Sequence, residues 1–100
     1  MPYFVDISEG PVASYLEDKQ KVSPALRRKL EDSLESNLGE RGDYFCLTES
    51  YRIRGTSRIQ FQLVLSDPET HKPRVFRVIA SDASASSGVL RVLYLDEVTV

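Results

Sequence analysis

Residues 23–39 read SPALRRKLEDSLESNLG and carry the clearest helix signal in the chain. Leucine recurs at positions 26, 30, 34 and 38, a spacing that places one apolar stripe along a helix. Ser23 is a favoured N-cap, and Pro24 suits the first helical position, where its missing N–H costs no hydrogen bond. We expect Gly39 to follow the last helical turn. The stretch therefore predicts an amphipathic helix whose leucines cover another layer of the fold.

The segment before this helix predicts a strand and a shorter helix. Tyr3–Ile7 is rich in aromatic and β-branched residues, which favours a strand. Ser8 is a candidate N-cap, Pro11 suits a first helical turn, and the apolar spacing that follows predicts a helix from about residue 11 to 19. A turn near residues 20–22 would join the two helices into an antiparallel hairpin.

After residue 43 the apolar period changes to two, which is typical of strands. The sequence offers strand candidates at 44–48, 51–54, 58–65, 74–80 and 89–95. Residues 55–57 and Asp67–Thr70 are expected to be turns. The segment SDASASSG at 81–88 is predicted to be either a mobile loop or one helical turn. Residues 89–95 are apolar on both faces, which favours a central strand that is covered on both sides.

These elements predict a single domain, residues 1–100, of the α+β class. We expect a two-layer sandwich, with an N-terminal strand and a helical hairpin packed on a four-stranded antiparallel meander. The leucine stripe would cover one sheet face, which is formed by Tyr51, Ile53, Ile59, Phe61 and Leu63.

Composition narrows the classes of function. The chain has 100 residues, a net charge of -2, one cysteine and one histidine. A disulfide-stapled scaffold and a metal centre built from several Cys and His ligands are therefore excluded, and no cofactor is expected. The sequence contains neither a secretory signal nor an apolar run long enough to cross a membrane, so we expect a cytoplasmic protein that does not contact membranes.

The charge is distributed unevenly along the chain. Residues 1–50 hold ten acids and six bases, a net of -4, whereas residues 51–100 hold five acids and seven bases, a net of +2. Five of the six bases within 51–77 are arginine, whose planar fork of donors suits phosphates and carboxylates. In a meander, Arg52, Arg54 and Arg58 would line the sheet face opposite the helices, together with Gln60 and Gln62. This face is a candidate site for a phosphate backbone or an acidic partner; the alternative is a solvated outer face that keeps the sheet soluble.

No strong catalytic signature is present. The sequence lacks the common nucleotide-binding, hydrolase and metalloprotease motifs. His71 lies in a polar loop, where we expect it to be solvated. Tyr94 could act as a general acid or base only if it lay on the sheet face that carries the arginines, and we expect it to pack in the core or at an edge instead. No residue is assigned a catalytic role.

The opening Tyr3–Ser8 and the amphipathic second helix resemble the start of the RelE/ParE toxin family. Residues 51–54, 58–61 and 74–79 are similar to that family's later strands. The resemblance implies a two-helix layer on an antiparallel sheet, whose arginines engage messenger RNA on the ribosome in one branch, whereas DNA gyrase is the target in the other. The matching positions are Arg52, Arg54, Arg58 and Arg77, and Tyr94 is the only candidate for a tyrosine near the C-terminus. If the chain were an enzyme, the resemblance would make it a metal-independent ribonuclease.

Two other functions stay open at this point. The same order of elements suits a non-catalytic protein-binding module, cystatin-like or a phage-type inhibitor, that acts through a sheet edge or through loops such as 81–88. The doubly apolar residues 89–95 would also suit a homodimer. The expected partners are therefore a protein (an antitoxin-like chain or a target), RNA or the ribosome, or a second copy.

Overall fold

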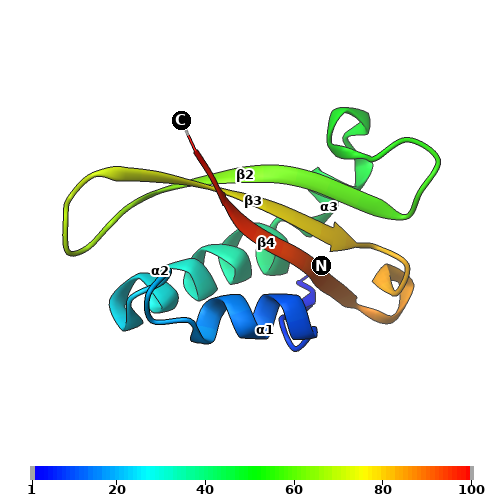
Figure 1. The fold of residues 1–100 in the computed structure, drawn as a ribbon. Helices are drawn as coiled ribbons and strands as arrows, with labels where there is room; N and C mark the ends of the chain where they lie inside the picture. Colours follow the sequence, from blue (N-terminus) through cyan, green and yellow to red (C-terminus); the bar gives the residue numbers. More distant parts are fainter. Residues whose placement is uncertain (1, 100) are drawn as a thin grey trace.

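The computed structural model describes residues 2–99, in which four strands and a set of helices follow one another as an α+β fold (Figure 1). No helix in this part of the chain is long and apolar enough to cross a membrane. The elements are β1 (Phe4–Asp6), α1 (Gly10–Glu17), α2 (Pro24–Leu34), the π-helical turn η1 (Glu35–Glu40), α3 (Gly42–Leu47), the 3-10 turn η2 (Glu49–Tyr51), β2 (Arg58–Ser66), β3 (Pro73–Ser81), the 3-10 turn η3 (Ala85–Ser87) and β4 (Val89–Val98).

The four strands form one mixed sheet in the order β1-β4-β3-β2. β2, β3 and β4 pair antiparallel, as the sequence predicts, but β1 joins the sheet beside β4 and runs parallel to it. The expected four-stranded antiparallel meander is therefore wrong: only β2, β3 and β4 form a meander, and the fourth strand of the sheet is the N-terminal β1, which pairs parallel. Figure 1 shows α1 and α2 on one side of the sheet, with no helix across the opposite side of its centre. We call that opposite side the outer face.

The leucine stripe of α2 is confirmed. Leu26, Leu30, Leu34 and Leu38 are all 0% exposed and lie in the core that the helices share with the sheet. The Ser23 side chain accepts a hydrogen bond from the Leu26 N–H at 3.2 Å, so the predicted N-cap is in place. The core side of the sheet is supplied by every second residue of β2 and β3, among them Ile59, Phe61, Phe76 and Val78.

The end of this helix differs from the prediction. Gly39 does not end it as a left-handed residue; the helix continues as η1, and Gly39 lies buried inside that turn. The Gly39 carbonyl accepts a hydrogen bond from the Tyr3 N–H at 2.7 Å, and a Cβ on Gly39 would lie 2.7 Å from Glu35 Oε1. The Glu35 side chain can move aside, and the Tyr3 carbonyl oxygen would lie 3.4 Å from such a Cβ, an ordinary contact distance, so neither a positive φ nor the N-terminal segment requires glycine here.

Residues 44–54 do not form the two expected strands. Residues 44–47 belong to α3, because Phe45 packs on Phe61 of β2 with ring centroids 4.4 Å apart, while Tyr44 and Leu47 face solvent. In 51–54, only Arg52 pairs with the sheet, through an isolated bridge to Ile59. Tertiary packing has thus overridden a short period-two pattern.

The expectation that β4 is covered on both faces is also wrong. β4 is central, between β1 and β3, and its Leu90, Val92 and Leu95 are buried. However, Tyr94 is 39% exposed on the outer face, so the sheet is covered on the helical side only. A register shift between Ile79 and Ala80 in the pairing with β4 accompanies the change in its apolar pattern.

A substitution of Gly42 tests the packing of α3 against the N-terminal segment and β4. A Cβ there would lie 2.6 Å from the Tyr3 ring and 2.7 Å from Leu90 Cδ1. We expect Gly42→Ala to lower the free energy of unfolding by about 1–3 kcal/mol, because the core must shift to admit the methyl group. Urea denaturation measures it. Gly10→Ala is the matched control, since Gly10 also begins a helix and a Cβ there meets nothing within 4 Å. Equal effects of the two substitutions would contradict the packing described.

Candidate functional site

The outer face is organised into rows that cross β2, β3 and β4. Strand register places Val64, Val75 and Val98 side by side in one row, and Gln60, Ile79 and Tyr94 in another. Between them lies a polar row of Gln62, Arg77 and Asp96. Along the strands the face therefore has an apolar row, then a polar row, and then a row of mixed character.

The apolar row is accessible to solvent. Val64 is 66% exposed, and Val75 and Val98 are half-buried, although they stand on a sheet whose other face is closely packed. Contiguous apolar side chains on an open face are typical of interaction sites in soluble proteins, whereas a single exposed valine is not. The row is therefore the part of the face best suited to exclude water against a partner.

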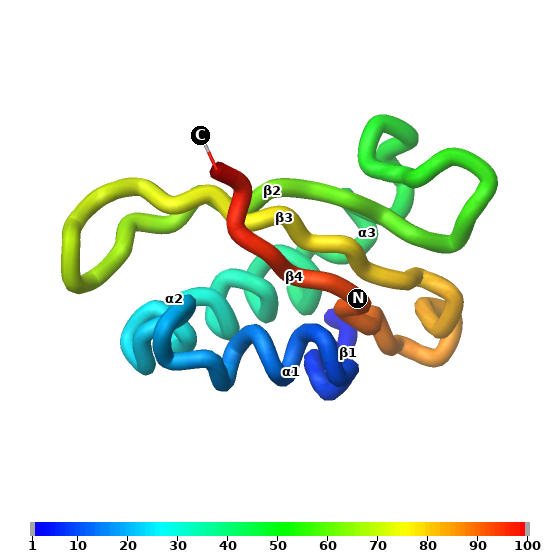
Figure 2. The backbone as a smooth tube through the Cα atoms, viewed as in Figure 1, coloured from blue at the N-terminus to red at the C-terminus, as the bar shows by residue number. Residues whose placement is uncertain are grey.

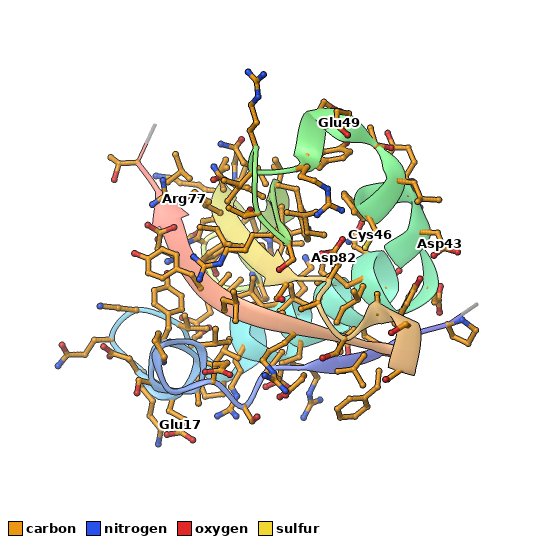
Figure 3. The ribbon with its side chains drawn as sticks, turned by 90° about the vertical axis from the view of Figure 1, so that its right-hand side faces the viewer. Glu17, Asp43, Cys46, Glu49, Arg77 and Asp82 are labelled. Carbon is orange, nitrogen blue, oxygen red and sulfur yellow. The ribbon has the colours of Figure 1, made fainter. Side chains whose placement is uncertain are left out.

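Arg77, one of the positions named by the family resemblance, stands on the outer face, but its charge is already paired. Its Nε and Nη2 donate to the two Asp96 carboxylate oxygens at 3.1 and 2.8 Å. The guanidinium also lies 5.8 Å from the ring centroid of Tyr94. Tyr94 is thus beside Arg77 on this face and not in the core, contrary to expectation. Figure 3 shows Arg77 on the opposite side of the sheet from Glu17 of α1.

Arg52 does not lie on the outer face. Its guanidinium pairs with the carboxylate of Asp82 and donates to the carbonyls of Cys46 at 2.8 Å and Thr56 at 3.3 Å. Figure 3 shows Cys46 and Asp82 close together at this junction. Arg52 therefore ties the end of α3 to the segment after β3, and its donors are used within the fold.

Arg54 and Arg58 remain available. Both side chains are exposed, Arg54 in the turn before β2 and Arg58 at the first position of that strand. Within residues 2–99 neither forms an ion pair. Of the four predicted binding arginines, the structure thus brings Arg54 and Arg58 together at one end of the sheet as unpaired cations.

A cluster of aromatic rings near the start of β2 was not predicted from the sequence. Tyr44 of α3 is 50% exposed and meets Tyr51 with ring centroids 5.7 Å apart. The Arg41 guanidinium lies 5.4 Å from the Tyr44 ring centroid. Arg41 and Tyr44 are three residues apart, a spacing that would have signalled a shared face only if 42–47 had been assigned to a helix.

Arg74 occupies a different position, on the helical side of the sheet. It donates to Asp67 Oδ2 at 3.0 Å, to Glu97 Oε1 at 2.7 Å and to the Lys21 carbonyl at 3.0 Å. The hydrogen bond from Arg74 lowers the pKa of Glu97. The hydrogen bond from the Glu69 backbone N–H lowers the pKa of Asp67, and the hydrogen bond from Arg74 lowers it further by a smaller amount. Arg74 therefore joins β3, the end of β4 and the turn between the two helices.

Comparison with protein-family models gives no match for this chain, and neither does comparison with curated proteins or with solved structures. The resemblance to the RelE/ParE toxins therefore stays a prediction.

The cluster formed by Arg74, Asp67 and Glu97 leads us to expect that the protein loses stability in acid. Both carboxyl groups have lower pKa values in the folded protein than their ordinary values of 3.8 and 4.5, so the stabilisation is present above those values. It is lost as the pH falls through the lowered values. We expect the free energy of unfolding, measured by urea denaturation, to fall below about pH 4.5.

The variant Arg74→Gln should lose less stability over this pH range, because it removes a cause of both pKa shifts. Arg28→Gln changes an exposed arginine of α2 and is the control. A pH dependence of Arg74→Gln as steep as that of the unmodified protein would show that the cluster does not supply the acid sensitivity.

Proposed function

We propose that this chain is a non-catalytic binding module that docks a partner protein on its outer face. The observation that carries the proposal is the exposed row Val64, Val75 and Val98, which crosses three strands of a sheet covered only on its other side. Burying such a row against a partner contributes about 25 cal/mol for each Å² of apolar surface removed from water.

The composition of the face supports a protein partner. Tyrosine and arginine, which are enriched in the centres of protein interfaces, are present in Tyr94 and Arg77. Lysine, which is depleted there, does not occur among the residues of β2, β3 and β4. The Arg77–Asp96 pair is already neutralised, so covering it leaves no uncompensated charge.

The chemistry of the partner follows from the two ends of the face. The valine row would pack against apolar side chains of the partner, whereas the unpaired guanidinium groups of Arg54 and Arg58 would bind its carboxylates. A segment that carries apolar residues at one end and acidic residues at the other would match both. An antitoxin-like chain or a target protein of this kind is the proposed partner.

A second candidate keeps the RelE/ParE resemblance: action on the translation or DNA machinery through the arginine-rich end. The specific observation in its favour is that exposed Arg54 and Arg58 remain unpaired, while the half-exposed ring of Tyr44 offers a surface for stacking. Arg52 and Arg77 support it less, because their donors are used by Asp82 and Asp96.

Crosslinking tests the first proposal. A photo-crosslinking amino acid placed at Val75 should form a discrete protein adduct in cells, and the adduct should disappear when Val64→Lys is added. Leu47→Lys is the matched control, because Leu47 is an exposed apolar residue of α3, 82% exposed, outside the row. Adduct formation that survives Val64→Lys, or is lost equally with Leu47→Lys, would refute docking at the valine row.

Binding to single-stranded RNA tests the second candidate. With two phosphate contacts, the logarithm of the affinity should fall with the logarithm of salt concentration with a slope of about -1.4. We expect Arg54→Ala/Arg58→Ala to abolish the binding in fluorescence anisotropy, whereas Arg28→Ala on the helical side should retain it. Equal binding by the double variant and the unmodified protein would remove this candidate.

A further inference from the structure

The longer of the two edges of the sheet is the edge of β2 that faces away from β3, since the other edge strand, β1, has only 3 residues. The Ile53 N–H donates to the Arg58 carbonyl at 2.9 Å from this side, so the backbone groups of Arg58 point away from β3. Because a strand repeats every two residues, Gln60, Gln62 and Val64 present their backbone N–H and C=O groups to the same edge.

Both ends of this edge are already occupied. At the start of β2, Arg52 bridges to Ile59. At the other end, the Lys29 ammonium group donates to the Ser66 carbonyl at 2.8 Å. In between, the backbone groups of Gln62 and Val64 face no strand among residues 2–99. The middle of the edge lacks two of the usual protections of an edge strand, since residues 59–65 contain no charged residue and no proline.

We propose that this edge pairs antiparallel with the same edge of a second copy, about a two-fold axis that passes between the two Leu63 residues. Gln62 of each copy then exchanges backbone hydrogen bonds with Val64 of the other. In this register Ser66 of one copy would come opposite Gln60 of the other, where Tyr51 already lies beside the Arg52–Ile59 bridge, so the pairing is confined to Gln62 and Val64 of each copy. Registers that extend the pairing toward the start of β2 would run into Arg52.

Charge supports a second copy as the occupant. Figure 2 shows the 52–57 loop and the β2–β3 turn at opposite ends of the molecule, whose longest dimension is 38 Å. Arg54 lies in that loop and Glu69 in that turn, and both are exposed. Antiparallel pairing brings Glu69 of each copy to the Arg54 end of the other, which gives two equivalent attractive contacts.

The pairing would make one continuous sheet from the two copies, with the outer faces side by side. It does not depend on a partner at the valine row. The contact is small, so we expect a weak dimer whose fraction rises with concentration over the micromolar range.

Sedimentation velocity between about 1 and 200 μM tests the proposal, a range set by the weak affinity expected of a small contact. We expect Gln62→Pro, which removes an N–H that faces the edge and not β3, to weaken dimerisation at least about tenfold. Gln62→Ala keeps that N–H and should dimerise like the unmodified protein. Circular dichroism confirms that the variants fold. A monomer at every concentration would overturn the proposal and leave the edge to a strand of another protein.

Charge reversal gives a test that leaves the strand unchanged. We expect Arg54→Glu and Glu69→Arg each to weaken the dimer about tenfold, and the double variant to restore it, because each single change brings like charges together. The two positions lie at opposite ends of one chain, so restoration requires contact between copies. Single variants that dimerise like the unmodified protein, or a double variant without restoration, would refute this pairing.

Discussion

The burial of one leucine stripe against one side of the sheet is the constraint on which the rest of the structure depends. Leu26, Leu30, Leu34 and Leu38 are fully buried, and each contributes about 2 kcal/mol through its removal from water. To meet this stripe, every second side chain of β2 and β3 must point toward the helices, and the intervening ones must point away. With α1 and α2 both on that side, the outer face is left to water or to a partner.

The arginines divide according to the same geometry. Arg52 and Arg74 sit where different layers meet. Arg52 binds Asp82 and the Cys46 carbonyl, and Arg74 binds Asp67, Glu97 and the Lys21 carbonyl. Arg77 lies on the outer face but is paired with Asp96 on the next strand. Arg54 and Arg58, at the end of the sheet, keep their donors. The unpaired cationic side chains therefore lie at that end of the sheet, while the exposed valine row lies on the outer face.

Local patterns predicted those parts of the fold that depend on neighbours in sequence. The α2 helix followed from a four-residue leucine spacing and a Ser-Pro start, and β2 from strict alternation. The parallel pairing of β1 with β4 joins residues far apart in the chain, and no local period specifies such a neighbour. Likewise, Phe45 entered a helix because it packs on Phe61, which lies in another element.

The candidate site was predictable only in part for the same reason. An arginine-rich stretch indicates where cations gather, but it does not reveal that Asp82 pairs with Arg52 or that Asp96 pairs with Arg77. The central claim is that the outer face, bare in the isolated chain, is covered in the cell. Hydroxyl-radical footprinting of the purified protein and of the protein in cells measures this directly. We predict that labelling of Val64 and Tyr94 falls in cells while that of Leu47 is unchanged; equal labelling of all three in both states would contradict the account.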